Sequence, residues 1–95
     1  MLRSEILDEA KRIVTTDRNK ESGEPEDNFG LIASLWNLYL GDDGFLSGSD
    51  VAALMILLKL SRIFKTASKV DSWIDIAGYA ACGGEIATKE KDVIV

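Results

Sequence analysis

An apolar helical pattern dominates residues 50–84, which read DVAALMILLKLSRIFKTASKVDSWIDIAGYAACGG. Apolar residues recur every three or four positions on both sides of Thr66–Lys69, a break that is too polar to continue a helix. The pattern therefore predicts two helices, one ending near Lys65 and the other running from about Lys69 to Glu85. Because a short link joins them, they should pack antiparallel as a helical hairpin.

Four charged residues interrupt the apolar faces of this hairpin: Lys59, Arg62, Asp71 and Asp75. Facing residues of an antiparallel pair have a nearly constant sum of residue numbers. Lys59 with Asp75, and Arg62 with Asp71 or Ser72, lie close to one such sum. We therefore expect both charge pairs to meet across the hairpin. The simplest interpretation is a row of salt bridges along a solvated rim.

The two acidic residues also allow a functional interpretation. Asp71 and Asp75 lie one turn apart on one helix face, where their charges repel unless a cation lies between them. Two such carboxylates can hold Mg²⁺ while water and phosphate oxygens complete its coordination. Lys59 and Arg62 are suited to phosphate oxygens. The hairpin is thus a candidate site for Mg²⁺ and phosphate, although acidic residues at this spacing occur on many helices.

Two further helices are predicted before the hairpin. The first, Ser4–Thr15, would be capped by its own first residue. The second, Asn28–Leu40, would be capped by Asp27 or by its own first residue and would stop at Gly41.

The connecting segments have the composition of loops and caps. Residues 16–27 lose the apolar periodicity and carry charged and turn-forming residues, so we expect a loop there, functional or mobile. Ser47 or Ser49 should cap the first helix of the hairpin, since Ser47–Asp50 has the form of a capping box. Residues 88–95 are expected to be a frayed tail or an arm that docks on a neighbour.

Length and patterning predict one all-α domain. Ninety-five residues form a single domain over residues 1–95, and no strand pattern or internal repeat competes with the helices. Four helices of these lengths match a small four-helix bundle. The helix after residue 50 is apolar on more than one side, which predicts that another subunit buries its second surface. We therefore expect a homodimer or homotetramer.

Charge and cysteine content exclude several classes of function. The net charge is -5, from 11 basic and 16 acidic residues, and no basic stripe is present, so nucleic acid is not an expected partner. Without histidine, and with Cys82 as the only cysteine, the usual Cys/His zinc sites cannot form.

The apolar segment Val51–Leu58 is far shorter than the roughly 20 residues of a membrane span. Charges interrupt the first helix, unlike a secretion signal, so we expect a cytoplasmic protein.

Several ordered motifs resemble small phage and prophage proteins of unassigned function. They are Thr16-Asp17-Arg18, EPEDNF at Glu24–Phe29, IASLW at Ile32–Trp36, Asp50-Val51-Ala52, KLSR at Lys59–Arg62 and DSWIDIAGYAA at Asp71–Ala81. These small proteins in turn look like the MazG-type all-α nucleoside triphosphate pyrophosphatases, in which carboxylates on adjacent helices bind Mg²⁺ and phosphates. The resemblance implies a MazG-like bundle in the host cytoplasm.

The resemblance to MazG also implies a reaction. A metal-activated water would cleave an NTP or dNTP between its α and β phosphates. Asp71 and Asp75 would bind the metal or orient the water, while Lys59 and Arg62 would neutralise phosphate charge. The MazG signature is an E-x-x-E pair on one helix and an E-x-x-D pair on the next. This sequence departs from that signature, because Ser72 stands where the acidic partner of Asp75 is expected.

Two other classes of function remain open. A nucleotide-binding protein that sequesters a signalling nucleotide would keep the fold and the phosphate-facing charges without turnover. Its candidate contacts are Arg18, Lys59 and Arg62 for phosphates and Asn28, Trp36 and Tyr79 for the rest of the nucleotide. A structural, partner-binding helical protein would use the hairpin charges only to fix the helix register.

Overall fold

The computed structural model describes the backbone of residues 1–17 and 24–94, and their side chains except at residues 17, 43 and 90–94. The helices are α1 (Arg3–Arg12), α3 (Pro25–Leu40), α4 (Gly48–Lys65) and α5 (Val70–Ile94), with a π-helical turn η1 (Ile13–Asp17) and a 3-10 turn η2 (Gly41–Asp43). No strand occurs in these described ranges, so the predicted all-α class with four helices is confirmed.

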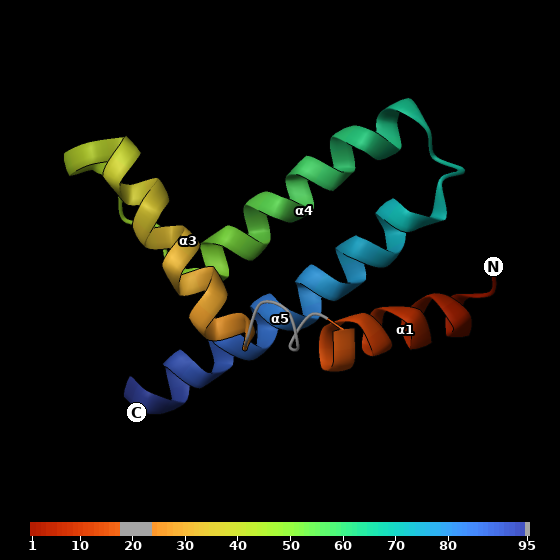
Figure 1. The fold of residues 1–95 in the computed structure, drawn as a ribbon, viewed down its shortest axis with the longest axis horizontal. Coiled ribbons are helices and arrows are strands. Elements are labelled where there is room, and N and C mark those ends of the chain that lie inside the picture. The colour runs from red at the N-terminus through yellow and green to blue at the C-terminus, as the bar shows by residue number, and fades with distance from the viewer. Residues whose placement is uncertain (18–23, 95) are drawn as a thin grey trace.

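The antiparallel hairpin of α4 and α5 is the framework of the molecule (Figure 1). The helix α3 crosses the hairpin at the N-terminal end of α4, and α1 lies along the first half of α5. Within the described residues α1 and α3 do not contact each other. One copy therefore forms a hairpin with two separate flanking helices.

The core lies where α3, α4 and α5 meet. Its buried side chains are Phe29, Ala33, Val51, Ala52, Tyr79, Cys82 and Ile86. Small residues let the backbones approach closely there: a Cβ atom built on Gly83 would lie 2.8 Å from the Cβ of Ala52. A Cβ atom on Gly48 would lie 3.5 Å from the Cβ of Phe29 and 3.6 Å from Cγ2 of Ile86. Cys82 is thus a buried residue of the core.

The helix α4 begins and ends as predicted. Ser47 is its N-cap: the amide of Asp50 donates to Ser47 Oγ at 3.4 Å, and the amide of Ser47 donates to Asp50 Oδ2 at 2.9 Å. This reciprocal capping box satisfies two amides that the helix itself leaves free. The helix ends at Lys65.

The start of α1 differs from the prediction. Its N-cap is Leu2 rather than Ser4, because the Leu2 amide donates to Glu5 Oε1 at 2.8 Å and so makes a serine cap unnecessary. Its end widens into the π-helical turn, where Thr15 Oγ1 donates to the carbonyl of Lys11 at 2.6 Å. Threonine hydroxyls that bond the preceding turn in this way distort a helix.

The helix α3 starts earlier than predicted. Pro25 occupies its first turn and Glu24 is the N-cap, so Asp27 and Asn28 lie inside the helix and do not cap it. Proline suits the first helical position because its fixed φ is helical and its missing amide is not needed there. Residues 25–27 of the predicted loop therefore belong to α3 and residues 16–17 to η1, while its residues 18–23 lie outside the described part of the chain.

The helix α5 is longer than predicted. It continues to Ile94 instead of ending near Glu85, so residues 88–94 are helical and not a frayed tail. Lys89 contributes to this extension: its Nζ lies 3.0 Å from Glu85 Oε1 one turn earlier and 3.1 Å from Glu26 Oε1 of α3. The ion pairs join the far end of α5 to the first turn of α3.

No helix in the described ranges is long and apolar enough to cross a membrane.

Candidate functional site

The first predicted charge pair is present in the hairpin. Lys59 Nζ lies 2.9 Å from Asp75 Oδ2, and the two side chains are 16 % and 35 % exposed. The pair therefore lies partly inside the seam between α4 and α5 rather than on an open rim. The prediction from the antiparallel register is confirmed for these two residues.

The second predicted charge pair, between Arg62 and Asp71, is not present among the described residues. Arg62 instead lines a pocket together with Ser72, the alternative partner in the same register. Asp71 is exposed and does not line this pocket.

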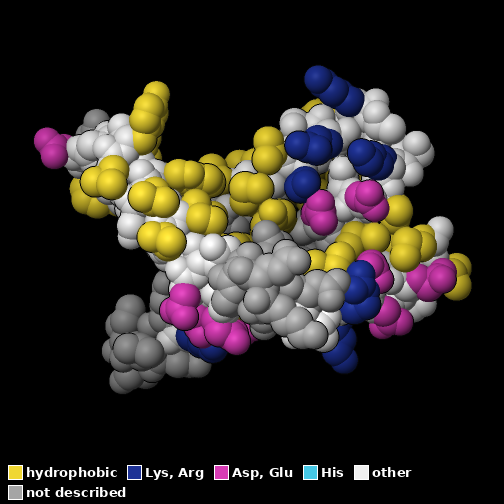
Figure 2. Space-filling model, viewed as in Figure 1, with side chains coloured by type: hydrophobic (Ala, Val, Ile, Leu, Met, Phe, Trp, Pro, Cys, Tyr) yellow, Lys and Arg dark blue, Asp and Glu magenta, His cyan; other side chains and the backbone are white. Residues whose placement is uncertain are grey.

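The pocket at the α4–α5 turn concentrates positive charge. It has a volume of about 190 Å³ and is lined by Arg62, Lys65, Thr66, Lys69 and Ser72. Three lining residues are cationic and none is acidic. Figure 2 shows a group of Lys and Arg side chains at this end of the hairpin, with acidic side chains beside them. The turn is thus a local basic site on a chain with a net charge of -5.

Hydrogen bonds define the shape of the turn that carries these side chains. The Thr66 amide closes α4 by donating to the Arg62 carbonyl at 2.9 Å, and the Lys69 amide donates to the Thr66 carbonyl at 3.3 Å. Trp73 Nε1 reaches back from α5 and donates to the carbonyl of Ala67 at 2.8 Å. Both sides of the turn are therefore anchored.

Ser72 is the buried polar residue of the pocket. It is 4 % exposed. Within the described part of the chain its hydroxyl has no hydrogen-bond partner, and Ser72 is one of the residues that line the pocket. A buried hydroxyl without a partner is unfavourable. An anion in this pocket would remove that cost.

Sequence reasoning missed two of the cations. Lys65 and Lys69 flank the link between the helices, and the turn brings both into the pocket with Arg62. Their signal in the sequence is their position at the two ends of the link, since Lys65 ends α4 and Lys69 directly precedes α5.

The acidic residues do not form a ready Mg²⁺ site. Among the described residues there is no group of three or more Asp, Glu, Cys or His side chains that could hold a metal ion. Asp75 is also engaged by Lys59, so a metal would have to displace an ammonium group from it. The donor set therefore does not fit the predicted role of Asp71 and Asp75 as metal ligands, and we derive no step through a metal.

The other predicted nucleotide contacts lie away from the turn. Tyr79 is buried in the core, its ring centroid 6.1 Å from that of Phe29, and does not line the basic pocket. Asn28 lies in the first turn of α3. Arg18 is outside the described residues.

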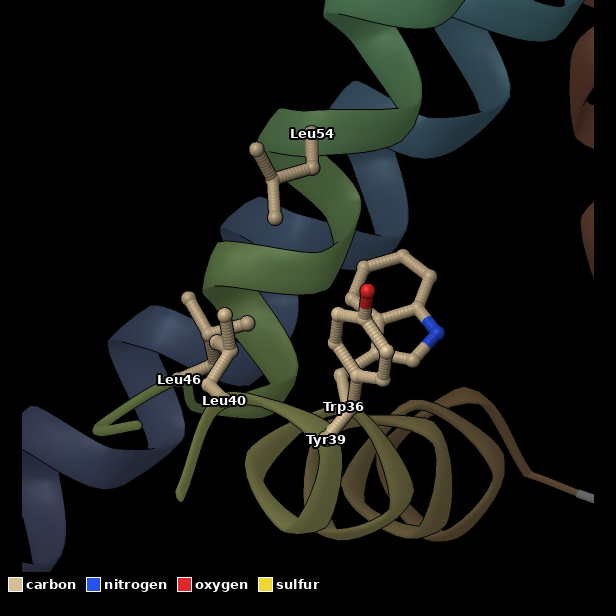
Figure 3. Close-up of a pocket in the computed structure, with 5 residues that line it drawn as sticks. All are labelled: Trp36, Tyr39, Leu40, Leu46 and Leu54. Carbon is tan, nitrogen blue, oxygen red and sulfur yellow. The ribbon is translucent and has the colours of Figure 1, made fainter. Parts of the chain in front are cut away.

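Trp36 lines a second pocket between α3 and α4. This apolar pocket has a volume of about 320 Å³, and its lining residues are Trp36, Tyr39, Leu40, Leu46 and Leu54. Figure 3 shows them converging from α3, the following link and α4. The two pockets share no residue, and they lie at opposite ends of α4.

Comparison with known proteins places the chain among phage proteins. It is 47% identical over 77 residues to the "Gene 55 protein" of Mycobacterium phage D29, covering 81% of this chain and 50% of the phage protein. It is 39% identical over 75 residues to the "Gene 55 protein" of Mycobacterium phage L5, covering 79% of this chain and 47% of the relative. The chain thus spans about half the length of these curated relatives.

The resemblance to small phage proteins is confirmed at this level, and neither relative's name carries a MazG assignment. No solved structure matches the chain. A protein family described as "Domain of unknown function (DUF6378)" matches residues 5–87. The chain therefore belongs to the DUF6378 family, which includes mycobacteriophage proteins.

Proposed function

We propose that the pocket at the α4–α5 turn binds the phosphate groups of a nucleotide and that the protein holds this ligand without hydrolysing it. The observation that carries the proposal is the convergence of Arg62, Lys65 and Lys69 on one pocket that also contains the hydroxyls of Thr66 and Ser72.

The electrostatics of the turn favour an anion. Cations in the last turn of α4 partly serve to stabilise the C-terminus of that helix. Lys69 lies outside α4, however, and stands directly before α5, whose N-terminus adds partial positive charge. Three like charges held in one pocket repel one another, and a phosphate group would relieve this repulsion through charge-assisted hydrogen bonds. Arg62 can also bind two phosphate oxygens at once.

The size of the pocket limits what it recognises. At about 190 Å³ it is smaller than the roughly 300–1,000 Å³ typical of sites that enclose a small molecule. It can hold phosphate groups but not a nucleobase as well. We therefore expect the affinity to depend on the number of phosphates more than on the base.

The Lys59–Asp75 ion pair favours binding over turnover. A hydrolase of the MazG type needs free carboxylates for its metal, whereas Asp75 is held by a lysine that is itself largely buried. Holding a nucleotide would suit a phage protein that withdraws a signalling nucleotide from its host.

Isothermal titration calorimetry tests this site directly. The ligands would be inorganic pyrophosphate, a ribonucleoside and a deoxyribonucleoside triphosphate, and a cyclic nucleotide. We expect Arg62→Ala and Lys69→Ala each to weaken binding by at least roughly tenfold, the loss of a charge-assisted hydrogen bond. Lys11→Ala is the matched control because it removes an equal charge from an exposed position on α1. Absence of binding, or equal loss in all three variants, would contradict the proposal.

A hydrolysis assay separates holding from turnover. Pyrophosphate release from the same triphosphates, with and without Mg²⁺, should stay at the level of the protein-free control. Mg²⁺-dependent release that disappears in Asp75→Asn would instead establish a MazG-type pyrophosphohydrolase.

A further inference from the structure

A single copy of this chain leaves an unusually large surface uncovered. Its accessible area is 6730 Å², whereas a compact monomer of its mass exposes about 5,400 Å². Its radius of gyration of 14.3 Å likewise exceeds the about 12.4 Å expected for this length. The excess area is on the order of 1,300 Å², more than the about 800 Å² that each partner buries in a standard protein interface.

Much of the uncovered surface is apolar and belongs to α4. We define the outer face of α4 as Ala53, Leu54, Leu57, Leu58, Leu60 and Phe64, all of which are exposed. The opposite side of the same helix is buried through Val51, Ala52 and Ile63. An apolar helix face is normally covered, so this second apolar face of α4 calls for a partner in addition to α3 and α5. Figure 2 shows hydrophobic side chains continuing across α3 and the adjoining half of α4.

We infer that the outer face of α4 packs against the outer face of α4 in a second copy, with the two helices antiparallel about a two-fold axis between Leu58 and Lys59. The residue spacing supports this register. Ala53, Leu57, Leu60 and Phe64 follow one another at intervals of four, three and four, which places them on one stripe of the helix.

The stripe is complementary to itself when it is reversed. In the antiparallel register Leu57 lies level with Leu60 of the second copy, and Phe64 of the second copy lies level with Ala53. The large ring of Phe64 thus meets the small side chain of Ala53. A two-fold axis makes each of these contacts occur twice, once in each direction. Phe64 is 88% exposed in the single copy. In the pair it lies one residue away from the level of Leu54 of the other copy, and Leu54 lines the apolar pocket shown in Figure 3.

Charge complementarity selects the antiparallel arrangement over the parallel one. The C-terminal end of α4 carries the basic pocket with Lys65 and Lys69, whereas Asp50 is exposed in the first turn of α4. In the proposed register the first turn of α4, with Asp50, lies beside the end of α4 in the second copy, where Lys65 begins the basic turn. A parallel pair would place two basic turns side by side, which like-charge repulsion opposes.

Sedimentation equilibrium tests the surface. The unmodified protein should be a dimer at micromolar concentration, and Leu57→Glu should weaken the dimer by at least roughly tenfold. Leu7→Glu on α1 is the matched control, because Leu7 and Leu57 are exposed to similar extents, 63% and 59%. A monomer at all concentrations up to the millimolar range, or an equal effect of both substitutions, would overturn the proposal and assign the outer face to another partner.

Disulfide crosslinking tests the register and does not depend on how far Leu57→Glu perturbs folding. Separate Ala53→Cys and Phe64→Cys chains should crosslink when they are mixed under oxidising conditions. Neither should crosslink with itself, since like positions would lie about 16 Å apart along the helix axis, beyond the reach of a disulfide. The unmodified chain is the control, because its Cys82 is buried. Crosslinking of each variant only with itself would show a parallel pair and contradict the register.

The crosslinking needs no nucleotide, and no residue of the outer face lines the basic pocket. The crosslinking therefore tests the pairing whether or not the basic pocket binds a nucleotide.

Discussion

The two ends of α4 are built from different chemistry. At the N-terminal end, glycine and alanine allow α3, α4 and α5 to meet over Phe29 and Val51, the two most deeply buried large side chains. At the C-terminal end an ion pair and a cationic pocket lie beside the buried side chains of Ile63 and Ile74. One helix thus joins the part of the molecule that holds the fold to the part that offers charge. Substitutions at the first end should reduce stability, and those at the second should mainly reduce ligand binding.

The largest expected effect is at the core end. Phe29→Ala should lower the free energy of unfolding by about 3–5 kcal/mol, because a 1 % exposed ring is replaced by a cavity. Phe45→Ala removes an equal ring at an 85% exposed position and should change it by less than about 0.5 kcal/mol. Urea denaturation measures both. Similar values for the two variants would place the core elsewhere.

A smaller effect is expected where α4 and α5 approach most closely. Gly83→Ala should destabilise the fold by about 1–3 kcal/mol, since the new methyl group would lie 2.8 Å from the Cβ of Ala52. The adjacent Gly84→Ala meets no atom within 4 Å and should stabilise it by about 0.4–1 kcal/mol. Thermal denaturation should therefore give a lower melting temperature for Gly83→Ala and a higher one for Gly84→Ala. A higher melting temperature for both variants would mean that the helices are not in close contact.

The Lys59–Asp75 ion pair should contribute less to the free energy of unfolding. A double-mutant cycle with Lys59→Met and Asp75→Asn should give a coupling free energy of about 1 kcal/mol, because the pair is only partly shielded from solvent. Chemical denaturation at low and high salt would measure this coupling. A coupling near zero would mean that the pair does not fix the register of the hairpin.

The smallest effect concerns Lys89 at the far end of α5. Hydrogen bonds to Glu85 and Glu26 raise the pKa of Lys89 above its ordinary value of 10.5. A raised pKa in the folded state stabilises the fold below that ordinary value, and this contribution is lost as the pH rises through the folded-state pKa. Lys89→Met should therefore be slightly less stable than the unmodified protein near neutral pH, and the difference should vanish at strongly alkaline pH. A difference that grows above pH 10.5 would contradict this assignment.

The hairpin was predictable because it depends on periodicity. The polar break at Thr66–Lys69 separates two apolar repeats, and the constant sum of facing residue numbers led to Lys59–Asp75 and to Arg62 beside Ser72. The same rule holds for Ala52 and Gly83 in the core. Ser47 was predictable as a cap because its hydrogen bonds are local.

The remaining differences arise from contacts that periodicity does not encode. The continuation of α5 past Gly84 involves Lys89 and Glu26, residues that are far apart in the sequence. The basic pocket depends on the path of the turn, which the bond from Trp73 to Ala67 holds in place. Tyr79 has the same apolar helical spacing whether it binds a base or packs on Phe29, and only the packing of α3 against the hairpin places it in the core.

The central claim, that the turn end of α4 is the anion site, is tested most directly by titrating inorganic pyrophosphate into ¹⁵N-labelled protein and mapping the amide shifts. The account predicts that the largest changes fall within residues 62–72 and disappear in Arg62→Ala. Changes centred on the α3 end of the hairpin around Trp36, or none at a large excess of pyrophosphate, would contradict it.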